Sequence, residues 1–187
     1  MTQSTSILWR RLDQAGHEAA RLVETASGYA LDGSAVFAEA GAPCRLNYRI
    51  VCDANWRTGS ANVHGWIGTR GVALDITADA QRRWFVNGIE CADALGCEDL
   101  DLSFSPLTNL LPIRRLRLKV GARAAVRAAW LRFPECRIEP LDQLYERAGD
   151  LAYRYESGGG SFVTVLQVNP AGFITHYPDL WTCESSL

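Results

Sequence analysis

The sequence is short of the residues that mark a nucleic-acid-binding or membrane-surface protein. It contains one lysine, Lys119, and its 19 basic and 21 acidic residues leave a formal net charge of −2. A chain this close to neutral has no overall field that would draw it onto nucleic acid or an anionic membrane. We therefore expect no nucleic-acid partner.

Long hydrophobic runs are missing as well. No stretch approaches the length of about 18 uncharged apolar residues that indicates a spanning helix. The first residues, Met1 to Arg11, do not combine a basic segment with an apolar run, which is the pattern of a secretory signal. The sequence thus predicts no membrane span and a cytoplasmic location.

Patterns of metal ligands and paired cysteines are also absent. The three histidines lie far apart in the sequence, and no two cysteines form a Cys-x-x-Cys arrangement. We expect six reduced thiols, most of them buried, with no metal and no cofactor. These cysteines are Cys44, Cys52, Cys91, Cys97, Cys136 and Cys183.

The composition that is present is that of an ordinary globular protein. Of the 187 residues, 48% are hydrophobic and 21% are charged. A compact chain of this size buries about 70% of its unfolded surface, so a large core is available. We expect a single domain over residues 1–187.

Hydrophobic residues recur with a period of two along most of the chain. Successive side chains of a strand point to opposite faces, so this alternation indicates half-buried strands. Runs of this kind cover residues 46–52, 72–76, 100–104, 116–120, 125–133 and 162–168. Short antiparallel strands in such numbers indicate an all-β roll, barrel or sandwich.

Turn signals separate these runs. The candidate hairpin turns are Asp32-Gly33, Thr58-Gly59, Asn87-Gly88 and Ala171-Gly172, of which Asn-Gly is the strongest signal. The glycine-rich stretch 157–161 is best explained as a hairpin loop, because it lacks the Lys-Ser/Thr ending of a phosphate-binding loop. A short helix is predicted at 140–147, where a strand through Leu144 and Glu146 is the alternative.

The most distinctive segment is Gly96 to Leu118. Asp99 and Asp101 share one strand face, and two prolines then prevent a regular central strand, since proline has no donor for the ladder. Thr108 and Asn109 can fix a turn there by bonding nearby backbone groups.

Two arginines follow in this segment, Arg114 and Arg115. They would point to opposite faces if the strand resumes. A buried arginine needs a carboxylate, and the two aspartates of the segment are the nearest in sequence. A buried Glu18 bonded to Arg114 or Arg115 is a further possibility.

The run PLTNLLPIRRL at 106–116, preceded by GCEDLD at 96–101, resembles the signature of the putative glycolipid-binding protein family. The resemblance extends from about Trp9 to Trp181. It implies a bacterial protein whose single curved antiparallel sheet closes into a spiral β-roll or open barrel with little helix. It also implies a likeness to carriers that hold lipid or lipoprotein chains in a curved sheet. Further matches are Trp9, His17, Glu18, Tyr48, Asp53, Trp56, Trp84, Gly88, Gln143, Tyr145, Tyr153, Tyr155 and residues 177–181.

The strand pattern, the aromatic residues and this resemblance together predict non-enzymatic binding of a glycolipid or another amphipathic ligand. An apolar cavity would hold an acyl chain, while aspartates and arginines of the central segment would meet the headgroup. Tyrosines, with apolar rings and polar tips, suit a wall that touches both parts. The candidate ligand-binding residues are Glu18, Asp99, Asp101, Thr108, Asn109, Arg114, Arg115, Tyr145, Tyr153 and Tyr155.

Other interpretations stay open at this level. The aspartates and arginines can instead form a structural network that braces an irregular crossing. Side chains of Asp99 and Asp101 lie ~6–7 Å apart on one strand face, so with Glu18 they could serve a carboxylate-dependent enzyme on a small molecule or glycan. The chain could also be an interaction protein without a ligand, whose sheet edges pair into a homodimer. The tryptophans most worth testing for a cavity are Trp9, Trp56, Trp66 and Trp84.

Overall fold

The computed structural model describes residues 4–187, which form one continuous 15-stranded sheet. Its first half comprises β1 (Ser4–Arg11), β2 (Gly16–Thr25), β3 (Gly28–Glu39), β4 (Ala42–Asp53), β5 (Thr58–Ile67), β6 (Arg70–Ala78), β7 (Trp84–Val86) and β8 (Ile89–Glu90). Its second half comprises β9 (Asp99–Leu102), β10 (Arg123–Arg132), β11 (Arg137–Gly149), β12 (Ala152–Ser157), β13 (Phe162–Val168), β14 (Ile174–Tyr177) and β15 (Trp181–Ser186). The helical segments are the 3-10 helices η1 (Ala92–Ala94), η2 (Pro106–Asn109) and η3 (Gly158–Gly160) and the α-helix α1 (Leu110–Leu116).

The order of the strands shows how the sheet rolls up. Strands β1 to β8 lie side by side in chain order, β1 pairs with β15, and β15 to β9 continue in reverse order. All neighbouring pairs are antiparallel except β9 and β10. A parallel pair needs a crossover connection, which η2 and α1 supply here. The outermost strands β8 and β9 do not pair with each other, so the sheet is not closed into a barrel.

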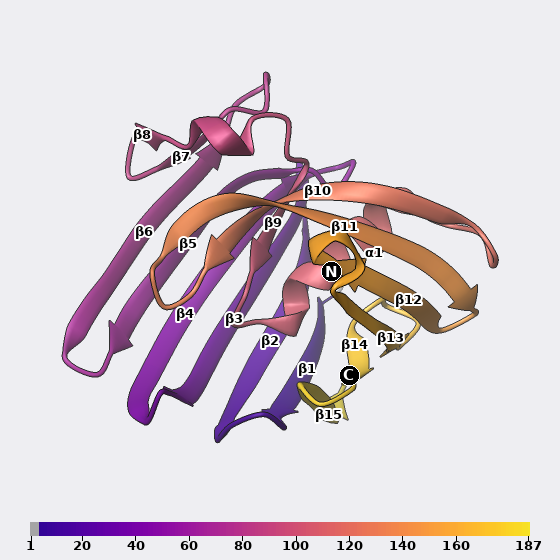
Figure 1. Cartoon of the computed structure of the whole chain (residues 1–187), viewed down its shortest axis with the longest axis horizontal. Helices are drawn as coiled ribbons and strands as arrows, with labels where there is room; N and C mark the ends of the chain where they lie inside the picture. Colours follow the sequence, from indigo (N-terminus) through magenta and orange to yellow (C-terminus); the bar gives the residue numbers. More distant parts are fainter. Residues whose placement is uncertain (1–3) are drawn as a thin grey trace.

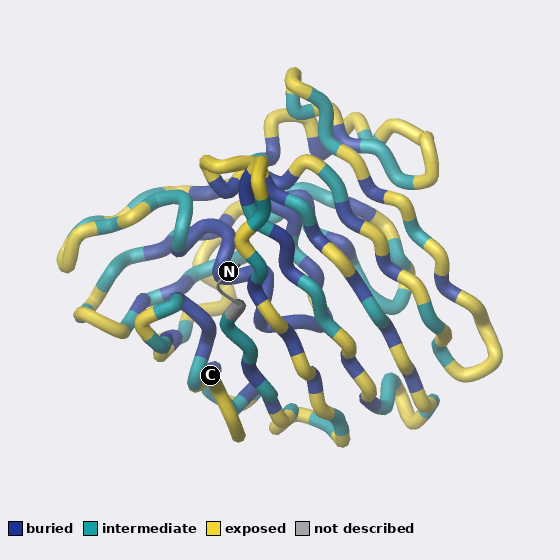
Figure 2. The backbone as a smooth tube through the Cα atoms, turned by 180° about the vertical axis from the view of Figure 1, so that it is seen from behind, coloured by how far each residue is buried: buried dark blue, intermediate teal, exposed yellow. Residues whose placement is uncertain are grey.

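The curvature of the sheet creates an interior. Figure 1 shows β10 and β11 crossing over the strands of the first half, with α1 between the two layers. Along β4, buried and exposed residues alternate from Cys44 to Cys52, and Figure 2 shows the same alternation along other strands. Large side chains such as Trp9, Trp84 and Phe104 fill the core. The predicted all-β curved sheet with little helix is confirmed.

No helix within residues 4–187 combines the length and apolar composition needed to cross a membrane. The six cysteines form no disulfide within the same residues. The sequence predicted that most of them are buried. Cys44, Cys52 and Cys97 are buried and the other three are half-buried.

Three of the predicted turns and loops join neighbouring strands. Asn87 and Gly88 connect β7 to β8 with positive φ angles of 50° and 78°, as the Asn-Gly signal indicated. The glycine-rich stretch at 157–161 connects β12 to β13, and Gly172 lies in the loop between β13 and β14. These predictions are confirmed.

The turns predicted at Asp32-Gly33 and Thr58-Gly59 are wrong. The first pair lies inside β3, and the second begins β5. Gly33 pairs with Tyr48 of β4, and a side chain at position 33 would overlap the Tyr48 ring. The glycine therefore makes room for an aromatic ring on the neighbouring strand, which a sequence pattern cannot distinguish from a turn.

The helix predicted at 140–147 is also wrong, and the alternative strand is confirmed as β11. Pro140 is tolerated because β12 covers β11 only from Gln143 onward. Position 140 thus has a neighbouring strand on one side alone, where a missing N–H costs little.

Candidate functional site

The proline-bounded segment is helical and lies inside the roll. Ser105 caps η2, because its Oγ accepts a hydrogen bond of 3.1 Å from the Leu107 backbone N–H. Pro106 occupies the first helical position, where its missing N–H leaves nothing unsatisfied. The helix α1 ends at Arg117, whose φ of 47° is left-handed. The strand predicted at 116–120 is therefore wrong, since the chain leaves α1 in a turn there.

Thr108 and Asn109 fix this segment through the nearby backbone, as predicted. The Thr108 hydroxyl accepts a bond of 3.3 Å from the Leu102 N–H, and the Asn109 side chain donates one of 3.2 Å to the Pro106 carbonyl. The Tyr145 hydroxyl donates to the Asn109 side-chain oxygen at 2.8 Å. All three side chains are buried and are satisfied by protein groups.

Asp99 and Arg115 form a bidentate ion pair between β9 and α1. Arg115 donates from Nε to Asp99 Oδ1 at 3.0 Å and from Nη2 to Oδ2 at 2.6 Å. Burial raises the pKa of Asp99 above its ordinary value, and the bond from Arg115 offsets part of that rise. The prediction that an aspartate of this segment pairs with one of its arginines is confirmed.

Glu18 lies fully buried on β2 and does not contact Arg114 or Arg115, so that expectation is wrong. The hydroxyl groups of Tyr48 and Ser105 both donate to its Oε1, the latter at 2.6 Å. Its Oε2 has no hydrogen-bond partner among residues 4–187. Burial raises the pKa of Glu18 to about 7, although the two hydroxyl donors and Arg11 act in the opposite direction. The Tyr48 ring fits beside β3 because position 33 is a glycine and has no side chain there.

Asp101 differs from Asp99 because no base neutralises it. The residue as a whole is half-buried, and its carboxyl group accepts one hydrogen bond of 2.6 Å from Gln143, with no ion pair among residues 4–187. Burial raises the pKa of Asp101 to about 6. Gln143 also donates to the Tyr155 hydroxyl at 3.0 Å, which links β9, β11 and β12.

Asp101 lies in a cavity of about 410 Å³ that we call the aromatic pocket. Three of its rings are in mutual contact, because the centroid distances of Tyr155, Phe162 and Tyr177 are 6.1–6.3 Å. Most of the wall is apolar, and the polar groups are concentrated near β9 and η2. Its lining residues are Asp101, Leu102, Ser103, Ser105, Pro106, Asn109, Trp130, Leu141, Tyr155, Ser157, Gly158, Phe162, Tyr177, Leu180 and Trp181.

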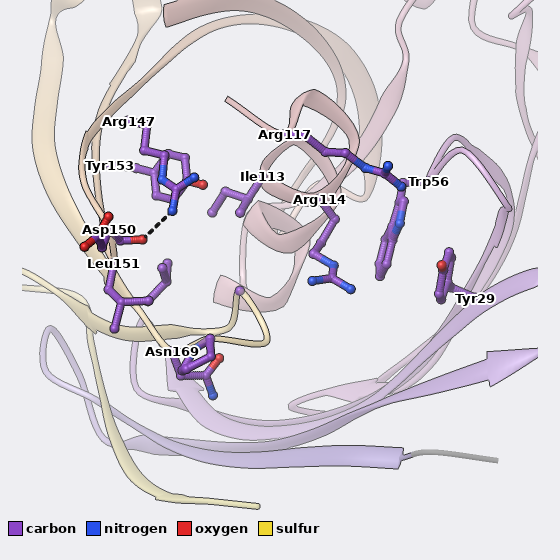
Figure 3. A pocket seen from close by; sticks show the side chains of 13 residues that line it. Tyr29, Trp56, Ile113, Arg114, Arg117, Arg147, Asp150, Leu151, Tyr153 and Asn169 are labelled. Carbon is purple, nitrogen blue, oxygen red and sulfur yellow. Dashed lines mark hydrogen bonds between the residues drawn. The ribbon is translucent and has the colours of Figure 1, made fainter. Parts of the chain in front are cut away.

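A second cavity, of about 550 Å³, lies at the other end of the η2–α1 segment, and we call it the arginine pocket (Figure 3). Arg114 and Arg117 reach it from α1, and Arg147 reaches it from β11. A smaller cavity that also contains Arg57 and Arg115 adjoins it through Trp56. The lining residues of the arginine pocket are Tyr29, Trp56, Ile113, Arg114, Arg117, Arg147, Asp150, Leu151, Tyr153, Val168, Asn169, Pro170 and Gly172.

One wall of the arginine pocket is a stack of aromatic rings. Tyr29 and Trp56 lie 3.8 Å apart with an interplanar angle of 16°, and the Arg114 guanidinium lies 5.0 Å from the Trp56 ring. Trp56 adopts a left-handed φ of 67°, which is rare for a bulky residue. The carboxylate of Asp53 stabilises this turn by accepting the backbone N–H groups of Asn55 and Arg57.

Comparison with known proteins identifies the family. The model of a family described as putative glycolipid-binding matches residues 6–183. The chain belongs to this family. A crystal structure of a DUF1089 family protein from Pseudomonas aeruginosa is similar, with a TM-score of 0.78 and 31% identity, over 88% of this chain and 91% of that one. No curated protein matches the chain. The resemblance carried by the central segment is confirmed.

The ten predicted site residues lie in several different places. Asp101, Asn109 and Tyr155 line the aromatic pocket, whereas Arg114 and Tyr153 line the arginine pocket. Arg115 borders the smaller adjoining cavity while it holds Asp99. The remaining members form the buried framework: Glu18, Asp99, Thr108 and Tyr145.

Sequence reasoning missed several lining residues. Arg117 lies in a stretch that was predicted to be a strand. No local pattern marked Arg147 as a pocket residue, because the hairpin of β11 and β12 brings it to the cavity. Phe162 and Tyr177 belong to strands far from the central segment. The alternation within β13 identified the face of Phe162 but not its partner across the cavity.

Proposed function

We propose that this member of the family binds a glycolipid, or another amphipathic ligand with a hydroxyl-rich headgroup, in the aromatic pocket and without catalysis. The observation that carries the proposal is the position of Asp101, a carboxyl group without a cationic partner among residues 4–187 at the side of an aromatic wall. Ligand sites are typically apolar cavities with a few placed polar groups.

The aromatic wall supplies the apolar half of the site. Trp130, Tyr155, Phe162, Tyr177 and Trp181 all line the cavity. Phe162 is 37% exposed, so part of this surface is open to a ligand. Covering it with a hydrocarbon chain removes apolar area from water, which contributes roughly 25 cal/mol for each Å².

Asp101 supplies the polar half. An ionised carboxylate has about four acceptor positions, of which Gln143 uses one. Sugar hydroxyl groups are donors that match the free positions, and hydrogen bonds to an ionised acceptor are about twice as strong as neutral ones. The serines and Asn109 beside Asp101 add smaller donors and acceptors.

Two-carboxylate hydrolysis is less well supported by the same geometry. Asp99 is buried against Arg115, and Glu18 is enclosed by Tyr48 and Ser105. Asp101 is thus the single carboxyl group that lines the aromatic pocket. Hydrolysis of a glycosidic bond by carboxylates ordinarily requires two of them on either side of the bond. The proposal is therefore binding, with residues 1–187 acting as one domain.

Titration calorimetry with octyl glucoside below its critical micelle concentration tests the proposal. We expect binding to the wild type and an affinity at least about tenfold lower for Asp101→Asn, since a charge-assisted hydrogen bond is lost. Phe162→Ala should also weaken binding because it removes part of the apolar wall. Wild-type affinity should fall as the pH drops below about 6, where Asp101 becomes protonated, and the Asp101→Asn variant should not show this fall.

Asp142→Asn is the matched control. Its side chain is 83% exposed and lies outside the aromatic pocket, so the variant removes the same charge elsewhere. Absence of binding by the wild type would contradict the proposal. Equal loss of affinity in Asp142→Asn and Asp101→Asn would contradict the assignment to this pocket.

A further inference from the structure

The arginine pocket gathers positive charge that the protein does not neutralise. Three guanidinium groups line it, and Asp150 is the one carboxylate in its lining. The whole chain has a net charge of −2, so this concentration of positive charge is local. The glycolipid proposal does not use these arginines, because they lie at the opposite end of the η2–α1 segment from Asp101.

Arg114 is held in place but is not paired. Its guanidinium lies 5.0 Å from the Trp56 ring and has no ion pair or hydrogen bond with any of residues 4–187. Figure 3 shows it beside Trp56, with Tyr29 beyond that ring. Gly172 approaches the Arg114 stem so closely that an added Cβ would lie 3.4 Å from Cδ and 2.8 Å from Leu110. The side chain is therefore oriented before any ligand arrives.

Arg147 is fixed by a different set of contacts. Its guanidinium donates to three backbone carbonyl groups, those of Leu118 at 2.9 Å, Asp150 at 2.8 Å and Gly149 at 3.3 Å. Carbonyl groups orient a guanidinium without cancelling its charge. Arginine has five N–H donors, so two remain for another acceptor.

Arg117 completes the positive set from the end of α1. It is exposed and has no ion pair among residues 4–187, in contrast to its neighbours Arg57 and Arg115. Those two arginines are neutralised by Glu98 and Asp99 at 3.0 Å and 2.6 Å. Among the arginines around these two cavities, those without an ion pair to any of residues 4–187 are the ones that line the larger cavity.

We propose that the arginine pocket binds the phosphate monoester group of a small organic ligand. A phosphate monoester carries about −1.5 to −2 charges at pH 7, which matches several guanidinium groups better than a carboxylate does. Arginine binds phosphate oxygens bidentately. Ile113, Leu151 and Val168 also line the cavity and would contact the carbon part of the ligand.

The shape and the charge argue against a nucleic-acid strand as the source of the phosphate. Such a partner needs a stripe of positive charge along the surface. Here three arginines line one cavity of a chain that is slightly acidic overall. A sugar phosphate, a glycerol phosphate or a lipid phosphate headgroup presents the same group on a smaller body.

Titration calorimetry at low salt with three probes tests the inference: inorganic phosphate, glycerol 3-phosphate and dihexanoyl phosphatidic acid below its critical micelle concentration. We expect glycerol 3-phosphate to bind and neutral glycerol not to bind. Arg114→Gln and Arg117→Gln should each lower the affinity about tenfold or more. Tighter binding of the phosphatidic acid would support a lipid headgroup as the source. Binding of inorganic phosphate as tight as that of glycerol 3-phosphate would overturn the assignment to an organic ligand.

Arg123→Gln is the matched control, because Arg123 is an exposed arginine on β10 outside the pocket. Arg117 is also exposed, so Arg117→Gln keeps the test informative even if Arg114→Gln fails to fold. Failure of all three phosphate probes to bind would overturn the inference. Equal loss of affinity in Arg123→Gln would overturn the assignment to this pocket. Neither result bears on octyl glucoside binding, which is measured separately.

Discussion

Asp99 and Arg115 form an ion pair with each other. Asp101 and Arg114 lie close to them in sequence but do not form such a pair within residues 4–187. The first pair joins β9 to α1 in the interior through two hydrogen bonds. Asp101 instead lies in the aromatic pocket, and Arg114 lies in the arginine pocket. One acid and one base thus hold the framework, and a second acid and base face two separate cavities.

Within this one segment, some residues have a structural role and others have the binding roles that we propose. An ion pair buried between two elements fixes their relative position, and removing one partner leaves an uncompensated charge. An acid and a base that face cavities without partners are available to ligands of opposite chemistry, a hydroxyl donor on one side and an anion on the other. Burial and partner, not residue type, distinguish the two roles.

The largest effect should come from breaking the buried pair. Asp99→Asn leaves the Arg115 charge buried without its counter-ion, so we expect the free energy of unfolding to fall by about 3–5 kcal/mol. Urea denaturation measures the change. Asp142→Asn breaks the exposed pair of Asp142 and Arg127, which are 83% and 52% exposed, and should cost less than about 1 kcal/mol. A loss below about 1 kcal/mol for Asp99→Asn would show that the ion pair of Asp99 and Arg115 contributes little to the stability of the fold.

A smaller effect should appear at Glu18, a buried acid that has hydroxyl donors and no basic hydrogen-bond partner among residues 4–187. Its pKa is raised from 4.5 to about 7 in the folded protein, so folding favours the protonated form. The stability from this group is complete below pH 4.5 and is lost as the pH rises to about 7. The loss amounts to about 3 kcal/mol, since one pKa unit corresponds to about 1.4 kcal/mol.

Glu18→Gln should remove this pH dependence and keep an acceptor for Tyr48 and Ser105. Denaturation between pH 4.5 and 8 measures it as the difference between the variant and the wild type. Asp99 and Asp101 also have raised pKa values, but they titrate in both proteins and cancel in the difference. Parallel pH profiles for the two proteins would refute the role of Glu18.

The smallest effect on stability should come from Arg114→Gln. This arginine contacts the Trp56 ring and forms no ion pair with any of residues 4–187, so the variant should lose less than about 1 kcal/mol of unfolding free energy. Urea denaturation of this variant beside Arg115→Gln tests the contrast directly. Comparable losses of unfolding free energy in Arg114→Gln and Arg115→Gln would contradict the distinction between a structural arginine and a pocket arginine.

The fold was largely predictable, because alternation of apolar residues reports local strand geometry. The prediction was wrong where a residue's presence is explained by a neighbouring strand and not by its own local sequence. Gly33 admits the Tyr48 ring from β4, and Pro140 stands where β11 has one neighbour. Residues 116–120 were predicted as a strand because apolar and polar residues alternate there. In the structure this stretch is the end of α1 and the turn that follows the left-handed Arg117.

The candidate site was predictable in its residue types and its main segment. The acids, the arginines and the tyrosines of the prediction all lie in or beside the two pockets or in the framework below them. Their division among these places was not predictable, because it depends on contacts between elements distant in sequence. Gln143 of β11 reaches Asp101, and Arg147 of the same strand reaches the arginine pocket.

By itself the sequence determined an all-β chain, a central segment interrupted by prolines, and an aspartate–arginine pair within it. These follow from local rules: strand periodicity, the missing N–H of proline, and the cost of burying a charge alone. Only the tertiary structure decided which aspartate meets which arginine. The parallel pairing of β9 with β10 sets where each acid lies, and the turn of α1 sends neighbouring arginines in different directions. Both are consequences of the rolled sheet, which no local pattern encodes.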